Sequence, residues 1–283
     1  MGYSIVGLII LLSPSLTYQC VESSQAGLVL SCPTLGPILA AFGTVESRTL
    51  RAVLQCQTTS GGQGATTAST LTSAKTSGTA IAITGITTAA STHGLVFDFG
   101  SPATENILAT GGGDIAINGT ATGTGYGVWL QATNVLATTG NISSNGGSGG
   151  INVVDDSILG KDSGGAITSS SSDITLTGDR LGQNAPLAID TTGAVVIQPF
   201  ADNFSSAQTF GNNLTISNNA TGLTMGKDLG AVAHTDSIDI ANAIDIAGPI
   251  NLYANDITLN ADVTSSLSNA DILLKASNNI TQN

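Results

Sequence analysis

The sequence predicts an all-β protein built as a three-sided parallel β-helix, with an irregular segment before it. Three features predict this fold: a composition poor in charge, short triplets of apolar, small polar and apolar residues, and the return of these triplets at a fixed spacing. The chain has 283 residues, of which 35 are glycine and 9% are charged, against averages of about 7% and about 25%. A long helical bundle is excluded, because it needs abundant Glu, Lys, Leu and Ala in helical register.

Charge and hydropathy narrow the classes of function. The formal net charge is −12 and the pI is about 4.1, so the chain repels phosphate and nucleic acid is not expected as a partner. Hydrophobic residues make up 41% of the chain, with a mean hydropathy of +0.27. This is too apolar for a disordered protein, which leaves an all-β chain with many turns.

Short triplets recur along the chain, each with a small or polar residue between two apolar ones. An alternation with period two indicates a strand whose successive side chains lie on opposite faces. Strands this short are too weak to stand as isolated hairpins. The triplets are Ile81–Ile83, Ile115–Ile117, Ile174–Leu176, Leu187–Ile189, Leu214–Ile216, Leu223–Met225, Ile238–Ile240, Ile244–Ile246, Ile250–Leu252 and Ile257–Leu259.

The spacing of the last four triplets predicts the coil. They begin at 238, 244, 250 and 257, and both Ile238 to Ile257 and Ile244 to Val263 are steps of 19 residues. Three short strands in each circuit describe a three-sided coil, in which each strand pairs in parallel with its equivalent one coil away. The alternative fold, an antiparallel β-sandwich, favours longer strands and hairpin turns.

Stacked coils have a defined inside. The apolar members of the last triplets should point inward and stack on their equivalents, so that a continuous core forms only after several coils. At about 4.8 Å between strands, roughly nine coils make a rod about 40 Å long. The residues predicted to point inward are Ile238, Ile240, Ile244, Ile246, Ile250, Leu252, Ile257 and Leu259.

Composition changes near residue 57 and divides the chain. The three cysteines, Cys20, Cys32 and Cys56, precede this point and the entire net charge follows it. An odd number of cysteines leaves at least one thiol unpaired, and without a Cys-x-x-Cys pair a zinc site has no support. We predict an irregular N-terminal segment over residues 1–78 and a β-helix repeat region over residues 79–283, truncated at its C-terminal end.

The N-terminus carries an apolar run, Ile5–Leu12. Eight residues are too few to span a bilayer, which takes about 20, but they suit the apolar region of a signal peptide. The preceding Met1–Ser4 has no positive charge, which a signal peptide normally has there. A weak signal-like start, a buried strand and a start outside the natural reading frame all remain open.

Four segments in the last third of the chain carry a resemblance to a known family: Thr192–Pro199, Leu214–Ser217, Gly222–Lys227 and Ala247–Ala254. These segments resemble the repeat region of filamentous-haemagglutinin-like adhesins, which are very large bacterial exoproteins. Residues 185–283 carry the resemblance well and residues 79–184 more loosely. It implies a right-handed parallel β-helix, an outer-membrane secretion partner, and an extracellular or cell-surface location associated with the outer membrane.

Acidic residues are the most abundant chemical groups, but their spacing predicts no site. Asp155 and Asp156 lie near Asp162, without the tandem glycine-rich nonapeptides of calcium-binding β-rolls. Calcium needs several oxygen ligands from one loop. Asp239, Asp245 and Asp256 fall at outward positions. A pair of acids at the spacing used by glycosidases, about 6.5–9.5 Å, would arise here by accident, so we interpret these carboxylates as solvated faces.

Catalytic patterns other than acid pairs are also missing from the sequence. The two histidines, His93 and His234, are 141 residues apart, and no nucleophile elbow of the Gly-x-Ser-x-Gly kind surrounds a candidate triad. Polysaccharide lyases need basic residues near the substrate, whereas Arg180 is the only arginine after residue 51. A row of exposed aromatics would favour sugar binding. The available ones are Tyr126, Trp129, Tyr253, Phe200, Phe204 and Phe210, which we interpret as too few.

These observations predict a non-catalytic segment of a bacterial surface or secreted adhesin that acts as a rod and adhesion scaffold. The alternative is a carbohydrate-active β-helix of the lyase or glycosidase kind. We expect no catalytic, cofactor-binding or metal-binding residue, and a receptor or glycan on a host or neighbouring cell as partner. Recognition should use the loops at 118–127 and 143–150, since loops vary where coils are fixed by stacking. The open end of the last coil should promote self-association.

Overall fold

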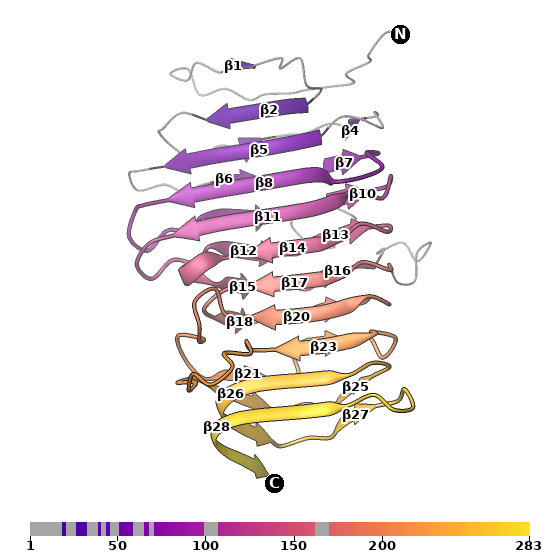
Figure 1. Ribbon diagram of the computed structural model, residues 1–283. Helices are drawn as coiled ribbons and strands as arrows, with labels where there is room; N and C mark the ends of the chain where they lie inside the picture. Colours follow the sequence, from indigo (N-terminus) through magenta and orange to yellow (C-terminus); the bar gives the residue numbers. More distant parts are fainter. Residues whose placement is uncertain are drawn as a thin grey trace.

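The protein is a three-sided parallel β-helix. The computed structural model describes residues 71–98, 107–161 and 170–283 in full, together with the backbone of six strands between residues 19 and 67. Figure 1 shows the strands stacked one above another along a single axis, from β2 near one end to β28 at the other. Each circuit of the chain adds one strand to each of three faces over most of this length, as the sequence predicts.

Face 1 lies toward the viewer in Figure 1 and forms the longest sheet. Its pairs are parallel except the first, β1 with β2, which is antiparallel. Its strands are β1 (Gln19–Cys20), β2 (Gly27–Cys32), β5 (Arg51–Thr58), β8 (Thr79–Thr87), β11 (Asp114–Ala121), β14 (Ile142–Asn145), β17 (Ile174–Thr177), β20 (Ala194–Gln198), β23 (Gly222–Met225), β26 (Ile250–Leu259) and β28 (Ile272–Gln282).

Faces 2 and 3 complete the coil. Face 2 contains β3 (Leu39–Ala40), β6 (Ala65–Thr67), β9 (Leu95–Asp98), β12 (Val128–Gln131), β15 (Ile151–Val153) and β18 (Leu181–Gln183). Face 3 contains β4 (Thr44–Val45), β7 (Leu71–Ser73), β10 (Ile107–Ala109), β13 (Asn134–Ala137), β16 (Ser157–Leu159), β19 (Leu187–Ile189) and β22 (Leu214–Ile216). A short 3-10 helix, η1 (Gly147–Gly149), precedes β15.

The coils change character near the C-terminal end. The first part of β26 pairs with β23 of face 1, and its second part pairs with β24 (Ser237–Ile240), which in turn pairs with β21 (Gln208–Phe210). Long strands therefore turn the corner and join two faces into one sheet. On the third side, β25 (Ile244–Ile246) and β27 (Val263–Ser265) form a separate two-stranded sheet.

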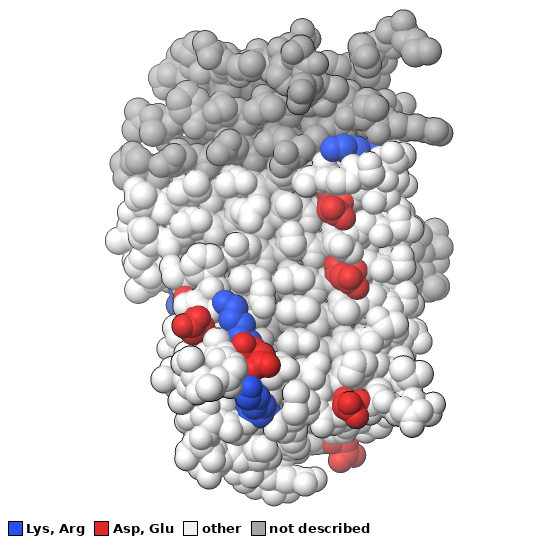
Figure 2. Space-filling view, viewed as in Figure 1, with Lys and Arg blue, Asp and Glu red and all other residues white. Residues whose placement is uncertain are grey.

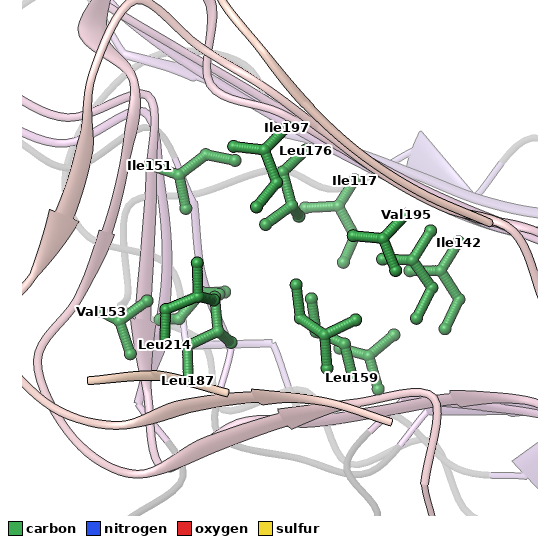
Figure 3. Close-up of a cluster of buried hydrophobic side chains, with 14 of the residues drawn as sticks. Ile117, Ile142, Ile151, Val153, Leu159, Leu176, Leu187, Val195, Ile197 and Leu214 are labelled. Carbon is green, nitrogen blue, oxygen red and sulfur yellow. The ribbon is translucent and has the colours of Figure 1, made fainter. Parts of the chain in front are cut away.

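The core consists of side-chain stacks that run along the rod. Alternation within β11 buries Ile115 and Ile117 while Ala116 and Asn118 lie outward. Figure 3 shows side chains from the different faces meeting inside the coil. One unbroken row on face 1 contains Ile81, Ile115, Ile142, Ile174, Val195, Leu223, Ile250 and Ile272.

The predicted coil spacing is confirmed. Ile238 pairs with Ile257, and Ile244 pairs with Val263. Of the eight residues predicted to point inward, six are buried, and Ile244 and Leu259 are partly buried against the core. In the middle of the chain, Ile107 pairs with Val135.

The N-terminal boundary differs from the prediction. Strands β2 to β7 already pair in parallel within the three faces, so the sheets begin well before residue 79. Composition misplaced this boundary, because cysteine and charge content do not determine backbone pairing. The signal-like run Ile5–Leu12 lies outside the described residues.

Side chains at one corner of the coil add hydrogen bonds between adjacent coils. Asp114 Oδ1 accepts the N–H of Asn141 at 2.9 Å, and Asn141 Oδ1 accepts the N–H of Asp173 at 3.2 Å. Asp173 Oδ1 in turn accepts the N–H of Ala194 at 2.8 Å. Figure 2 shows acidic side chains aligned along one edge of a mostly uncharged face. Carboxylates at this corner thus link neighbouring coils and do not converge on a ligand.

Candidate functional site

The corner before face 2 brings together four residues that we call the aromatic–arginine cluster: His93, Tyr126, Trp129 and Arg180. His93 precedes β9, Tyr126 precedes β12, Trp129 lies within β12, and Arg180 precedes β18. The chain has a single tryptophan, and Arg180 is the only arginine after residue 51. This cluster is therefore the most distinctive group of side chains on the described surface.

Trp129 lies on the outer side of face 2. Its neighbours Val128 and Leu130 are fully buried in the core, and alternation in a strand directs Trp129 the other way. It pairs with Val96 of β9 and with Asn152 of β15. Both of these outward residues are nevertheless buried, at 6% and 1% exposed, while Trp129 itself is half-buried.

The three rings contact one another. The ring centroids of His93 and Trp129 are 4.1 Å apart with an interplanar angle of 36°. Tyr126 lies edge-on to Trp129, at a centroid distance of 6.1 Å and an angle of 66°. Offset and edge-on arrangements suit the quadrupoles of aromatic rings. The Tyr126 backbone N–H also donates to His93 Nδ1 at 3.0 Å, which fixes the imidazole between two coils.

Arg180 reaches back across one coil to hold this group. Its Nε donates to the Gly149 carbonyl at 2.8 Å, and its Nη2 donates to the carbonyls of Thr124 and Gly125 at 2.8 and 2.9 Å. The guanidinium carbon lies 3.9 Å from the centroid of the Tyr126 ring, within the range of a cation–π contact. Charge-assisted hydrogen bonds are the stronger kind, so Arg180 clamps loops from two preceding coils.

Glycines leave room for these contacts. Gly150 has φ +74°, and a Cβ there would meet the Arg180 carbonyl oxygen at 2.2 Å and its Cγ at 2.5 Å. A Cβ on Gly182 would meet Asn152 Oδ1 at 2.1 Å and the Tyr126 hydroxyl at 3.0 Å. Side chains at either position would displace the arginine or the tyrosine.

His93 is held in its neutral form. Burial lowers the pKa of the imidazole, and the nearby positive charge of Arg180 lowers it further. Because Nδ1 accepts the Tyr126 N–H, the proton of the neutral ring resides on Nε2. Within the described residues Arg180 is therefore the cluster's single charge, and none of the ion pairs found there includes it.

The acidic candidates do not form a site. Asp155 is half-buried and Asp156 is exposed, and the Asp156 N–H donates to Asp155 Oδ1 at 2.9 Å within one turn; Asp162 lies outside the described residues. Asp239 and Asp256 accept hydrogen bonds from asparagine side chains of the last coils at 2.7 and 2.8 Å. Asp245 is exposed on β25.

The second histidine lies in the interior near the C-terminal end. His234 is 4% exposed, and its Nδ1 is 3.8 Å from Asp236 Oδ1. Asp236 Oδ2 accepts the N–H of Phe204 at 2.9 Å. Neither ring nitrogen of His234 has a hydrogen-bond partner among the described residues. In the whole described part of the chain, no three His, Cys, Asp or Glu side chains converge in the manner of metal ligands.

Sequence reasoning missed the aromatic–arginine cluster. It counted aromatic residues without placing them, although Phe204 and Phe210 are core residues at 4% and 2% exposed and Phe200 is 52% exposed. The loops predicted for recognition, 118–127 and 143–150, do supply Tyr126 and Gly149, but their first residues belong to β11 and β14. The rarity of tryptophan and arginine was the available signal.

Fold and cluster together define a parallel β-helix with an aromatic–arginine group on its flank. Comparison with protein-family models, curated proteins and solved structures finds no match to this chain. Among the described residues, no helix has the length and apolar character needed to cross a bilayer.

Proposed function

We propose that this chain is a non-catalytic rod segment of a bacterial surface or secreted adhesin. Its stacked coils hold a recognition site away from the cell, and that site is the aromatic–arginine cluster. One observation carries the proposal: the chain's single tryptophan and the only arginine after residue 51 lie two coils apart along face 2, and both contact Tyr126 on the outer flank of the rod.

Surface chemistry supports an extracellular role. The chain is acidic, with a net charge of −12, which keeps a rod soluble and disfavours anionic membranes. Tryptophan, tyrosine and arginine are also the residue types enriched at the energetic centres of interfaces. The resemblance to filamentous-haemagglutinin-like adhesins points to export through an outer-membrane partner, and to display on or release from the cell surface.

Self-association through the last coil belongs to the same proposal. Strand β28 pairs with β26, and its apolar residues Ile272, Leu273 and Ile280 are 44%, 42% and 52% exposed. An apolar strand edge is a template for pairing with another chain. End-to-end contact would lengthen the rod.

The deciding experiment measures binding of the purified chain to bacterial and host cells, alongside polysaccharide-cleavage assays. We expect saturable cell binding and no depolymerisation. Absence of binding to every cell type would contradict the adhesin role. Depolymerisation that is lost in an Asp155→Asn, Asp156→Asn double variant would instead establish the alternative, a carbohydrate-active β-helix.

A further inference from the structure

We propose that the aromatic–arginine cluster binds an uncharged glycan, with a pyranose ring against the exposed part of Trp129. This inference rests on the proposed function and names its ligand class. A pyranose presents a C–H-rich face and a rim of hydroxyls, so it needs an aromatic surface bordered by hydrogen-bonding groups. Ligand sites are typically of this kind, mostly apolar and aromatic with a few placed polar groups.

The cluster supplies both parts. Trp129, Tyr126 and His93 are each half-buried, with rings held in mutual contact. Their positions are fixed by β12, by the His93–Tyr126 hydrogen bond and by the Arg180 clamp. A rigid aromatic surface loses little conformational entropy when a ligand binds, which favours affinity.

Three polar groups of the cluster are left for a ligand. Among the described residues, none hydrogen-bonds to the indole N–H of Trp129, to the hydroxyl of Tyr126 or to Nε2 of His93. Because Nδ1 of His93 is already an acceptor, Nε2 carries a proton and donates. Two donors and one hydroxyl therefore border the aromatic surface, which suits the oxygens of sugar hydroxyls.

The arginine favours a neutral ligand over an acidic one. A guanidinium binds a carboxylate best through two parallel N–H bonds along one edge. Arg180 has two edges that present a pair of parallel N–H groups, Nε with Nη2 and Nη1 with Nη2, and Nη2 belongs to both. The two hydrogens of Nη2 are already donated to the carbonyls of Thr124 and Gly125. Nε is committed to the Gly149 carbonyl. No complete fork remains for a uronic or sialic acid, and the net charge of −12 repels anions in general.

The single tryptophan makes the test specific. Because Trp129 is the only tryptophan, its fluorescence reports on this cluster alone. The full chain is titrated with neutral tetrasaccharides (cellotetraose, maltotetraose, chitotetraose and mannotetraose), with tetragalacturonate as the acidic comparator. We expect a saturable change with at least one neutral probe that is insensitive to added salt, since no ion pair forms. No fluorescence change with any of the four neutral probes, or a change with tetragalacturonate alone, would overturn the proposal.

Variants locate the binding. Trp129→Thr should abolish binding measured by calorimetry, and Tyr126→Phe, which removes one hydroxyl and keeps the ring, should weaken it several-fold. The matched control is Tyr253→Phe, the same change at a half-buried tyrosine on β26, which should bind as the native chain does. Circular dichroism checks that each variant folds. Native affinity in both cluster variants would refute the assignment.

The outcomes separate this inference from the proposed function. Cell binding that survives in Trp129→Thr would leave the adhesin role of the rod standing and refute the cluster as its recognition site. Neutral-glycan binding that depends on Trp129, in a chain that binds no cell, would establish the site and contradict the adhesin role.

Discussion

Ser144 interrupts a core stack, and its replacement by alanine should stabilise the protein. It lies on face 1 between Ile117 and Leu176 in the adjacent coils, at a position that is apolar in both. Its side chain is 2% exposed, and Oγ has no hydrogen-bond partner among the described residues. A buried hydroxyl without a partner costs about 1–3 kcal/mol in mutational data. Alanine keeps the Cβ and removes that hydroxyl, so we expect a gain of about 1–2 kcal/mol.

Ser143 provides the matched control. It is the neighbouring residue on the same strand but points outward and is exposed, and its Oγ donates to the Ile115 carbonyl at 3.4 Å. Ser143→Ala should change stability by less than about 0.5 kcal/mol, as most surface substitutions do. Thermal unfolding should separate the two variants by about 2–4 °C for each kcal/mol, the range for chains of 150–250 residues.

Hydrogen exchange adds a local measurement. Stacked coils are stabilised by their nearest neighbours, so slower exchange in Ser144→Ala should concentrate in β11, β14 and β17 and fade in distant coils. An unchanged or lower stability would refute the reasoning, because it would mean that Oγ is hydrogen-bonded in the native state. An equal gain in Ser143→Ala would also refute it.

Three further predictions concern other parts of the molecule. Arg180→Lys should cost about 1–3 kcal/mol, because an ammonium cannot reproduce the three carbonyl bonds and the contact with Tyr126; faster amide exchange in the clamped loops checks this. The pKa of His93 is lowered from 6.5, so its contribution to stability is present above that value and is lost as the pH falls through the folded pKa; thermal unfolding from about pH 8 to about pH 5, with His93→Gln as control, tests the sign. Ile280→Lys on β28 should reduce self-association measured by light scattering.

Inward residues could be predicted because the information is local. A strand of three residues and a return of 19 residues placed Ile238 beside Ile257, and the structure pairs them. Parallel stacking requires each coil to present similar side chains at equivalent positions. The repeat in the sequence therefore identifies the residues of the core.

Insertions set the limit of that reasoning. The third face is broken between β22 and β25, which lie in consecutive coils without pairing, and the intervening loops include the segment that carries His234 and Asp236. Ser144 occupies a position in an apolar stack, so its strand lacks the second apolar residue of a triplet. A search for triplets alone therefore does not find this coil. Irregular loops shift the period from one coil to the next, and no fixed spacing then identifies equivalent residues.

The sequence did not show that the residues of the aromatic–arginine cluster lie together, for a related physical reason. Arg180 bonds to the carbonyl of Thr124, 56 residues earlier, and two coils with loops of different length separate them. Their proximity depends on the number of coils and not on the number of residues. Each coil advances the chain by about 4.8 Å along the rod, so the Arg180 side chain reaches across two such steps, over the intervening loop that carries Gly149 and Gly150.

Packing of the core and binding at the outer surface therefore depend on different positions of the sequence. Inward positions must satisfy the stacks above and below, so they are restricted to residues such as Ile115 and Val128. Outward positions on face 2, in the row Val96, Trp129, Asn152 and Gly182, lie outside these stacks, so a substitution at the half-buried Trp129 leaves the core unaltered. A solenoid of this kind can change what it binds by substitutions on one outer row and one corner, while the coil that supports them stays the same.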